Sequence, residues 1–344
     1  MFESRPHIDL TLPRSWNQCT TEQLETIAAC ILKHTMLATR FHPFDWQDVK
    51  SELFFLLAEV EILTTETAED DPEDATYICR LARHRSRRFC RRQSHAPSFP
   101  LRPWQVQYWI DTQLQWLDDE KSTLVIFPYK HLVFTRHWQW HWPFIKKTYH
   151  APAELLQDCD WQRYRHLQDY MSMYIDQQNA ILRLLRHRRD DSQDAAAQQA
   201  ALTATRNEFL KTLFTPTALA ATTATVPGGS AAGKAAAKNA AAIARRVSRI
   251  TEIQWQVILL WWSGMMHYLK DHYPRCFRSA PVKKNPKRPP NPFDLYTSIV
   301  ATIQDKAHID EDHINTQTYT IVLEHLERIA KENEEIEKTN RKHK

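Results

Sequence analysis

The chain has 344 residues, 42% of them hydrophobic and 12 of them tryptophan, so it is large and apolar enough to bury a sizeable core. It has only four glycines, which disfavours sandwiches, barrels and Rossmann folds, because those folds need glycine at tight turns and phosphate contacts. The 45 Lys and Arg against 41 Asp and Glu leave a net charge of +4, too small an excess to require a nucleic-acid partner. We therefore expect a mainly α protein, with a helical body and a small antiparallel β element.

Cysteine usage and apolar runs indicate a reduced cytoplasmic protein. The six cysteines are scattered without a C-x-x-C pair, and the N-terminal residues have no apolar core typical of a signal peptide. The apolar run that starts at Val257 covers about ten residues, roughly half of a membrane span. No membrane partner and no cofactor are expected.

The first predicted segment, residues 1–94, combines a short strand with helices. Period-2 alternation predicts the strand over 8–12, and the T-x-x-Q capping box at Thr20 starts the first helix. A second helix is expected from Asp45 as N-cap through Val60. After an acidic loop, a third helix is expected over 75–92.

Three further segments follow in chain order. Residues 95–191 begin with a proline-rich boundary and contain a helix over 106–117, a hairpin or extended pair near 123–142, and a long amphipathic helix over 159–188. Residues 192–245 are alanine-rich and read as a linker or insertion, part helical and part flexible, in which 209–214 form a short apolar helix. Residues 246–344 form a C-terminal helical region, with helices over 246–273, 293–305 and 313–340.

The stretch PGGSAAGKAAAK (227–238) has the G-x-x-x-x-G-K spacing of a phosphate-binding P-loop at Gly228, Gly233 and Lys234. A working P-loop also needs a preceding buried strand and a Ser or Thr after the lysine to hold Mg²⁺. Here Ala235 follows the lysine, and Thr- and Ala-rich residues precede the glycines. We expect no nucleotide binding.

The stretch RHWQWHW (136–142) contains two histidines four residues apart. On a strand, His137 and His141 would lie about 13 Å apart, too far to share a metal ion. We expect an aromatic strand packed on the body, and no metal site.

An Arg-rich helix is expected over 79–92, with Arg80, Arg83, Arg87, Arg88 and Arg91 on its polar surface. Such a basic patch can bind phosphates or a partner. The alternative is a solvated helix whose arginines pair with the acidic loop at 68–74.

The C-terminal helix carries a heptad seam of residues spaced alternately three and four apart: Tyr319, Val322, Leu326, Ile329, Asn333 and Ile336. A polar Asn within a seam can fix the register or the oligomeric state of a coiled coil. The seam either packs against the protein's own body or binds a partner or a second copy.

The sequence contains no G-x-S-x-G, no H-E-x-x-H and no carboxylate pair at a recognisable spacing, so we expect no catalytic residues and no enzyme.

Three stretches in order carry a resemblance: 8–24, 149–174 and 294–329. The first holds a strand followed by Leu12, Pro13, Ser15 and Trp16 and then a helix. Together they resemble poorly characterised proteins of phage-like and tail-like elements in Bacteroidetes, sometimes labelled tail assembly chaperones. The resemblance implies a tail component as neighbour or partner and implies no catalytic residue.

Residues and resemblance together predict a non-enzymatic assembly or scaffold protein of a phage-like tail, which binds a protein partner through helical surfaces. Two alternatives stay open. One is a nucleic-acid-binding accessory protein of a mobile element, acting through the Arg-rich helix. The other is a structural component that stays in the particle.

Overall fold

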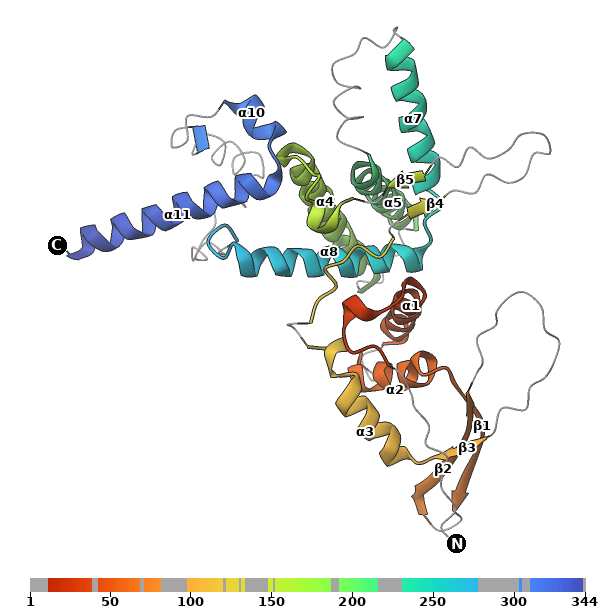
Figure 1. Cartoon of the computed structure of the whole chain (residues 1–344). Coiled ribbons are helices and arrows are strands. Elements are labelled where there is room, and N and C mark those ends of the chain that lie inside the picture. Colours follow the sequence, from red (N-terminus) through yellow and green to blue (C-terminus); the bar gives the residue numbers. More distant parts are fainter. Residues whose placement is uncertain are drawn as a thin grey trace. The chain divides into compact units, whose positions relative to one another are not determined.

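The computed structural model contains nine α-helices and two small antiparallel sheets among the residues it describes (Figure 1), which confirms the predicted mainly α fold with a small β element. The described residues are 12–38, 43–68, 71–81, 98–119, 122–129, 131–133, 148–150, 152–186, 192–215, 231–277, 303–304 and 310–342. The strand predicted over 8–12 lies almost entirely outside them.

The chain divides into two compact units, each made of two stretches of sequence. Unit 1 comprises 1–128 and 251–265, and unit 2 comprises 129–250 and 266–344. These units do not coincide with the four segments that composition suggested.

Unit 1 begins with two helices whose first turns are capped as the sequence predicts. The Thr20 hydroxyl accepts the Gln23 backbone N–H, and the Gln23 amide oxygen accepts the Thr20 N–H, which completes the capping box before α1 (Thr21–Leu37). The Asp45 carboxylate caps α2 (Trp46–Leu57) by accepting the Gln47 N–H at 2.9 Å. Ile27, Leu53 and Phe54 are fully buried between these helices and their neighbours.

A three-stranded sheet follows, and part of its second strand lies where sequence patterns predicted helix. Helix α2 stops at Leu57, and Glu59 then adopts a left-handed φ of 53°, so the expected continuation through Val60 is wrong. The antiparallel strands are β1 (Val60–Ala68), β2 (Asp71–Leu81) and β3 (Phe99–Leu101), in that order. The helix predicted over 75–92 is therefore wrong for 75–81, and 82–97 lie outside the described residues. Strand β1 is rich in Thr and also holds Val60 and Ile62, and β2 holds the run Thr76, Tyr77 and Ile78; these residue types fit a pleated surface better than a helix.

The rest of unit 1 consists of short helices and one close backbone approach. Helix α3 (Pro103–Gln113) starts with proline, and its Ile110 is buried. Residues 122–128 then run along the first part of α8 (Glu252–His272), where the Trp261 indole donates to the Val125 carbonyl at 3.0 Å. At Gly264 of α8, a Cβ would lie only 2.8 Å from the Leu124 nitrogen. Only glycine fits there.

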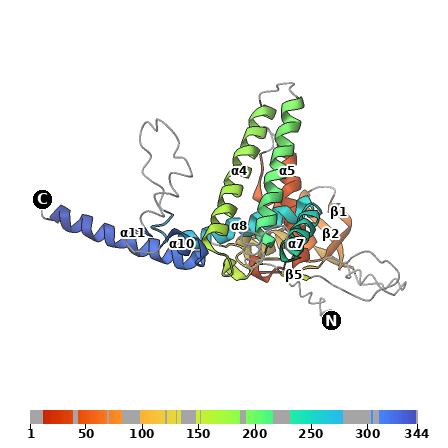
Figure 2. The same cartoon turned by 90° about the horizontal axis from the view of Figure 1, so that it is seen from above.

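Unit 2 contains the long amphipathic helix that the sequence predicts and much of the alanine-rich segment. Helix α4 (Trp161–Arg186) lies beside α5 (Ser192–Phe214), as both views show (Figures 1 and 2), and α5 also contacts α7 (Ala231–Val247). Residues 209–214 form the end of α5, and four of their side chains are buried there: Phe209, Leu210, Leu213 and Phe214. The alanine-rich segment is thus helical over most of its described length.

Unit 2 also holds a two-stranded sheet, β4 (His131–Val133) with β5 (Thr148–His150). Strand β4 lies within 123–142, where a hairpin or extended pair is expected, but its partner β5 follows that region. Its C-terminal elements are α10 (Glu311–Thr316) and α11 (Tyr319–Lys342), and both contact α4. The distal half of α11 extends away from α4 and α10 toward the C-terminus (Figure 1).

Candidate protein-binding surfaces

The predicted seam of the C-terminal helix is divided between the interior of unit 2 and solvent. Its proximal members Tyr319, Val322 and Ile329 are 0%, 1% and 5% exposed. The Tyr319 ring stacks on Tyr164 of α4 with centroids 4.5 Å apart, and its hydroxyl donates to the Leu155 carbonyl. These seam residues therefore pack against the protein's own body, which was one of the two alternatives.

A salt-bridge cluster holds the middle of α11 to the segment after α8. The Arg275 guanidinium lies 2.8 Å from a Glu327 carboxylate oxygen and 3.2 Å from one of Glu334. The backbone N–H groups of Arg275 and Cys276 also donate to Glu327. Burial raises the pKa of Glu327, but these hydrogen bonds lower it more, so the net pKa lies below its usual value.

Beyond this cluster the seam is open to solvent. Asn333 is exposed, and Ile336 is 53% exposed although it is a large apolar side chain on a charged helix. Leu326 is half-buried. Of the six predicted seam residues, Asn333 and Ile336 are thus the two whose side chains are exposed to solvent.

The predicted basic patch begins on a strand instead of a helix. Residues 79–81 end β2, which corrects the Arg-rich helix expected over 79–92 at its start. Arg80 lies opposite Glu61 in the β1–β2 register, and its guanidinium contacts that carboxylate at 2.7 Å. Arg83, Arg87, Arg88 and Arg91 lie outside the described residues, so phosphate binding by this patch stays a prediction.

An exposed aromatic surface in unit 1 was missed by sequence reasoning. Trp104 and Tyr108 are each 63% exposed, and their i, i+4 spacing places them on one face of α3. Gln107 on the same face accepts a hydrogen bond from the Gln47 side chain at 3.0 Å, so the first turn of α2 lies beside it. There Phe44 and Trp46 form an edge-to-face pair with centroids 5.4 Å apart. We call Phe44, Trp46, Trp104 and Tyr108 the aromatic surface.

The signal for this surface was present in the sequence but ambiguous. A tryptophan and a tyrosine four residues apart on a short helix usually mark a face turned toward the core. In this helix Val106 and Ile110 occupy the buried face instead, and they leave the larger rings outside.

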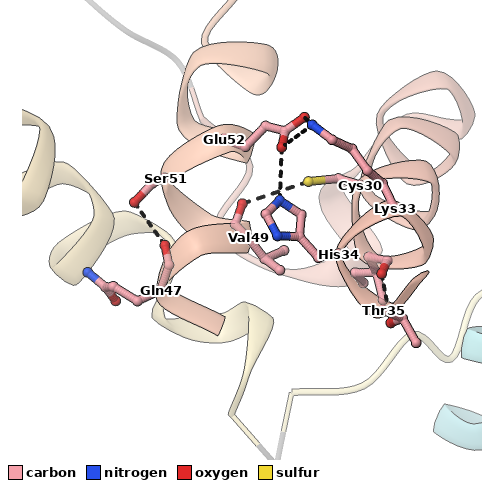
Figure 3. A network of polar contacts seen from close by, with 9 residues as sticks. Cys30, Lys33, His34, Thr35, Gln47, Val49, Ser51 and Glu52 are labelled. Atoms are coloured by element: carbon pink, nitrogen blue, oxygen red, sulfur yellow. Dashed lines mark hydrogen bonds and ion pairs between the residues drawn. The ribbon is translucent and has the colours of Figure 1, made fainter. Parts of the chain in front are cut away.

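A second group missed by sequence reasoning is a polar cluster between α1 and α2. Figure 3 shows Glu52 of α2 pointing toward Cys30, Lys33 and His34 of α1. The Lys33 ammonium lies 2.8 Å from both Glu52 carboxylate oxygens, and His34 Nε2 lies 2.9 Å from one of them. Hydrogen bonding to Lys33 lowers the pKa of Glu52, while burial and then the Glu52 charge raise the pKa of Cys30 to about 11.

Other predicted features lie partly outside the described residues. Gly233 and Lys234 are in the first turn of α7, and Gly228 precedes the described part. The His/Trp stretch at 136–142 is also outside it. The absence of nucleotide binding and of catalysis therefore stays a prediction.

Comparison of the chain with protein-family models, curated proteins and solved structures finds no match. Within the described part of the chain, no helix combines the length and apolar character needed to cross a membrane.

Proposed function

We propose that this chain is a non-enzymatic assembly or scaffold protein of a phage-like tail, acting in the host cytoplasm and binding a tail protein through helical surfaces. The observation that carries the proposal is the aromatic surface of unit 1. Two of its rings, Trp104 and Tyr108, are each 63% exposed on one helix face. The tail context comes from the sequence resemblance.

Energetics favour this surface as the main contact. Tryptophan, tyrosine and arginine supply most of the binding energy at protein interfaces. Covering the exposed part of each ring would remove roughly 100 Å² of largely apolar surface from water. At about 25 cal/mol per Å², that is worth about 2–3 kcal/mol per ring. The complementary site on the partner would be an apolar groove or pocket.

The distal half of α11 suits a secondary contact. Ile336 is a large, exposed apolar side chain of the seam in this half of α11. Four glutamates and several basic residues surround it. One apolar anchor among charges gives selectivity more than affinity. We therefore assign the main affinity to the aromatic surface and expect α11 to contribute less.

Co-expression with the tail proteins encoded by neighbouring genes tests the proposal. We expect one of them to co-purify with the wild-type chain, and the double variant Trp104→Ala/Tyr108→Ala to bind it about a thousandfold more weakly, because two rings at about 2 kcal/mol each contribute about 4 kcal/mol. Met36→Ala is the matched control, since Met36 is a 77% exposed apolar side chain of the same unit outside the aromatic surface.

Three outcomes would contradict the proposal. The first is that no neighbouring tail protein binds, and the second is that the double variant binds as well as the control. The third is salt-dependent DNA binding that disappears when Arg83, Arg87, Arg88 and Arg91 become Ala, which would favour the nucleic-acid alternative. Detection of the chain in purified particles would instead identify a structural component, because an assembly protein leaves.

A further inference from the structure

Three side chains from two helices of unit 1 place metal-binding atoms close together. Cys30 and His34 are one helical turn apart on α1, and Glu52 faces them from α2 (Figure 3). One donor atom from each side chain, a sulfur, an imidazole nitrogen and a carboxylate oxygen, lies within 4.8 Å of the other two. The spacing Cys-x-x-x-His on a helix is one that directs both side chains to the same ion.

The separation of these atoms is near that of a zinc site. Tetrahedral Zn²⁺ bonds of about 2.0–2.3 Å place neighbouring ligand atoms about 3.3–3.8 Å apart. His34 Nε2 and the Glu52 oxygen are already 2.9 Å apart, so the ion would enter by replacing that hydrogen bond. Because the sulfur lies within 4.8 Å of the other two donor atoms, it has at most about an ångström to approach, which a small side-chain rotation supplies.

The surroundings suit three protein ligands and one open position. Cys30 is 3% exposed, and its sulfur lies against the Val49 carbonyl at 3.9 Å on the inner side. The His34 and Glu52 side chains are 20% and 31% exposed, so the outer side opens to solvent. Water can therefore occupy the fourth position, as in zinc sites that are not fully enclosed by protein.

Lys33 already contacts Glu52, so metal binding has to leave a place for its ammonium group. It now bonds both Glu52 oxygens at 2.8 Å. With an ion on one oxygen, Lys33 keeps the other and holds the carboxylate in a single orientation, which is the role of outer-shell partners in metal sites. Its positive charge opposes a cation, while the Cys30 thiolate and the Glu52 carboxylate together offset the charge of Zn²⁺.

We propose that Cys30, His34 and Glu52 form a binding site for Zn²⁺. A sulfur and an imidazole among the donors select zinc over magnesium or calcium, which prefer oxygen ligands. On binding, the Cys30 thiol releases its proton to solvent and the sulfur bonds the ion. The proposal is independent of the aromatic surface and of the proposed function.

An ion pair that only joins the two helices would explain Lys33, His34 and Glu52, with the Cys30 thiol serving only as a hydrogen-bond donor to Glu52 and to the Val49 carbonyl. The thiol therefore separates the two explanations. If the cluster serves as a salt bridge alone, Cys30→Ala has no effect on metal uptake.

The test titrates the full-length chain, stripped with a chelator, with Co²⁺ as a spectroscopic probe and with Zn²⁺ as competitor. We expect one Co²⁺ per chain at this site, with thiolate-to-metal charge-transfer absorption that Zn²⁺ abolishes. Cys30→Ala should remove this absorption. His34→Ala and Glu52→Gln, at partly exposed positions that tolerate substitution, should weaken Zn²⁺ binding by at least about tenfold to a hundredfold.

Cys19→Ala is the matched control, since Cys19 is a half-buried thiol just before the same helix, whose sulfur contacts the Ser15 carbonyl. It should bind as the wild type does. Circular dichroism of each variant checks that α1 and α2 are formed. The proposal is overturned if the wild-type chain shows no thiolate absorption with Co²⁺, or if the Cys30, His34 and Glu52 variants all bind Zn²⁺ as tightly as Cys19→Ala.

Discussion

The contacts within each unit differ in kind between unit 1 and unit 2. In unit 1 the backbone at Leu124 approaches α8 so closely that Gly264 has no room for a Cβ. In unit 2, polar side chains reach backbone carbonyls at the ends of other elements. Arg163 of α4 donates to the carbonyls of Thr212 and Leu213 at the end of α5, and Tyr319 donates to Leu155.

This difference predicts what each unit tolerates. At a close backbone approach, added volume is costly because the backbone cannot move aside. Carbonyls at helix ends have no partner within their own helix, so a lost donor is costly while small changes of shape are tolerated. The four predictions below test this contrast from the largest expected effect to the smallest.

Adding one methyl group at Gly264 should have the largest effect. A Cβ there would lie within 3.0 Å of the Leu124 backbone, which cannot move aside as a side chain would. We expect Gly264→Ala to lower the stability of unit 1 by about 3 kcal/mol or more. Hydrogen exchange of α8 and residues 122–128 measures this, with Ser263→Ala, at an exposed neighbouring position, as control. Equal protection in both variants would contradict the close approach.

Removing the donor at Arg163 should have the next largest effect. Arg163 is 7% exposed, and its guanidinium donates to the Thr212 and Leu213 carbonyls at 2.9 and 2.7 Å. Arg163→Met keeps much of the volume but leaves both carbonyls without this donor, at a cost of about 2–3 kcal/mol. The readout is amide exchange in α5. Arg183→Met, at an exposed position of α4, should change nothing, and an equal loss in both would contradict the capping role.

Removing one hydroxyl from Tyr319 should have a smaller effect. Tyr319→Phe keeps the stacked ring on Tyr164 and loses only the hydrogen bond to Leu155. We expect a loss of about 1 kcal/mol, seen as faster exchange at the start of α11. A loss as large as that of Arg163→Met would mean that the hydroxyl does more than satisfy one carbonyl.

Protonation of Glu327 in acid should weaken the contact that holds the middle of α11, and its effect on free energy should be the smallest of the four. The folded pKa of Glu327 lies below its usual value of about 4.3, so its contribution is complete above that pH and is lost as pH falls through the lower folded pKa. The mobility of a spin label on the exposed face of α11 should therefore rise as pH falls below about 4. Glu327→Gln should remove that step, and a step that persists in this variant would assign it to another carboxyl group.

Sequence patterns predicted the elements whose signals are local. The capping box at Thr20, the Asp45 cap and the long stripe of α4 each specify a helix within a few residues of its own chain. The sheet was missed because Ile78, Leu81 and Ala82 fit the apolar side of a helix, which was predicted over 75–92. The run Thr76, Tyr77 and Ile78 also favours a strand, and that strand is stabilised by pairing with β1 and β3.

The candidate sites likewise depend on packing between elements, which local sequence patterns do not show. The Cys30–His34 spacing is visible in the sequence once α1 is predicted, but Glu52 joins them only because α2 packs against α1. Likewise, Trp104 is exposed because other residues of α3 form the face that packs against the rest of the unit. Three of the six predicted seam residues are buried, and tertiary packing decides where along α11 burial ends.

Unit 1 cannot be completed early in synthesis, because its two stretches of sequence are separated by residues 129–250. A ribosome that has completed residue 128 has still to make the part of α8 that carries Trp261 and Gly264, both of which contact residues 124–125. At 5–20 residues per second, that delay is on the order of ten seconds. During it, the nascent N-terminal helices remain an incomplete unit and expose apolar surface that α8 later covers, so a fragment truncated before residue 251 should aggregate.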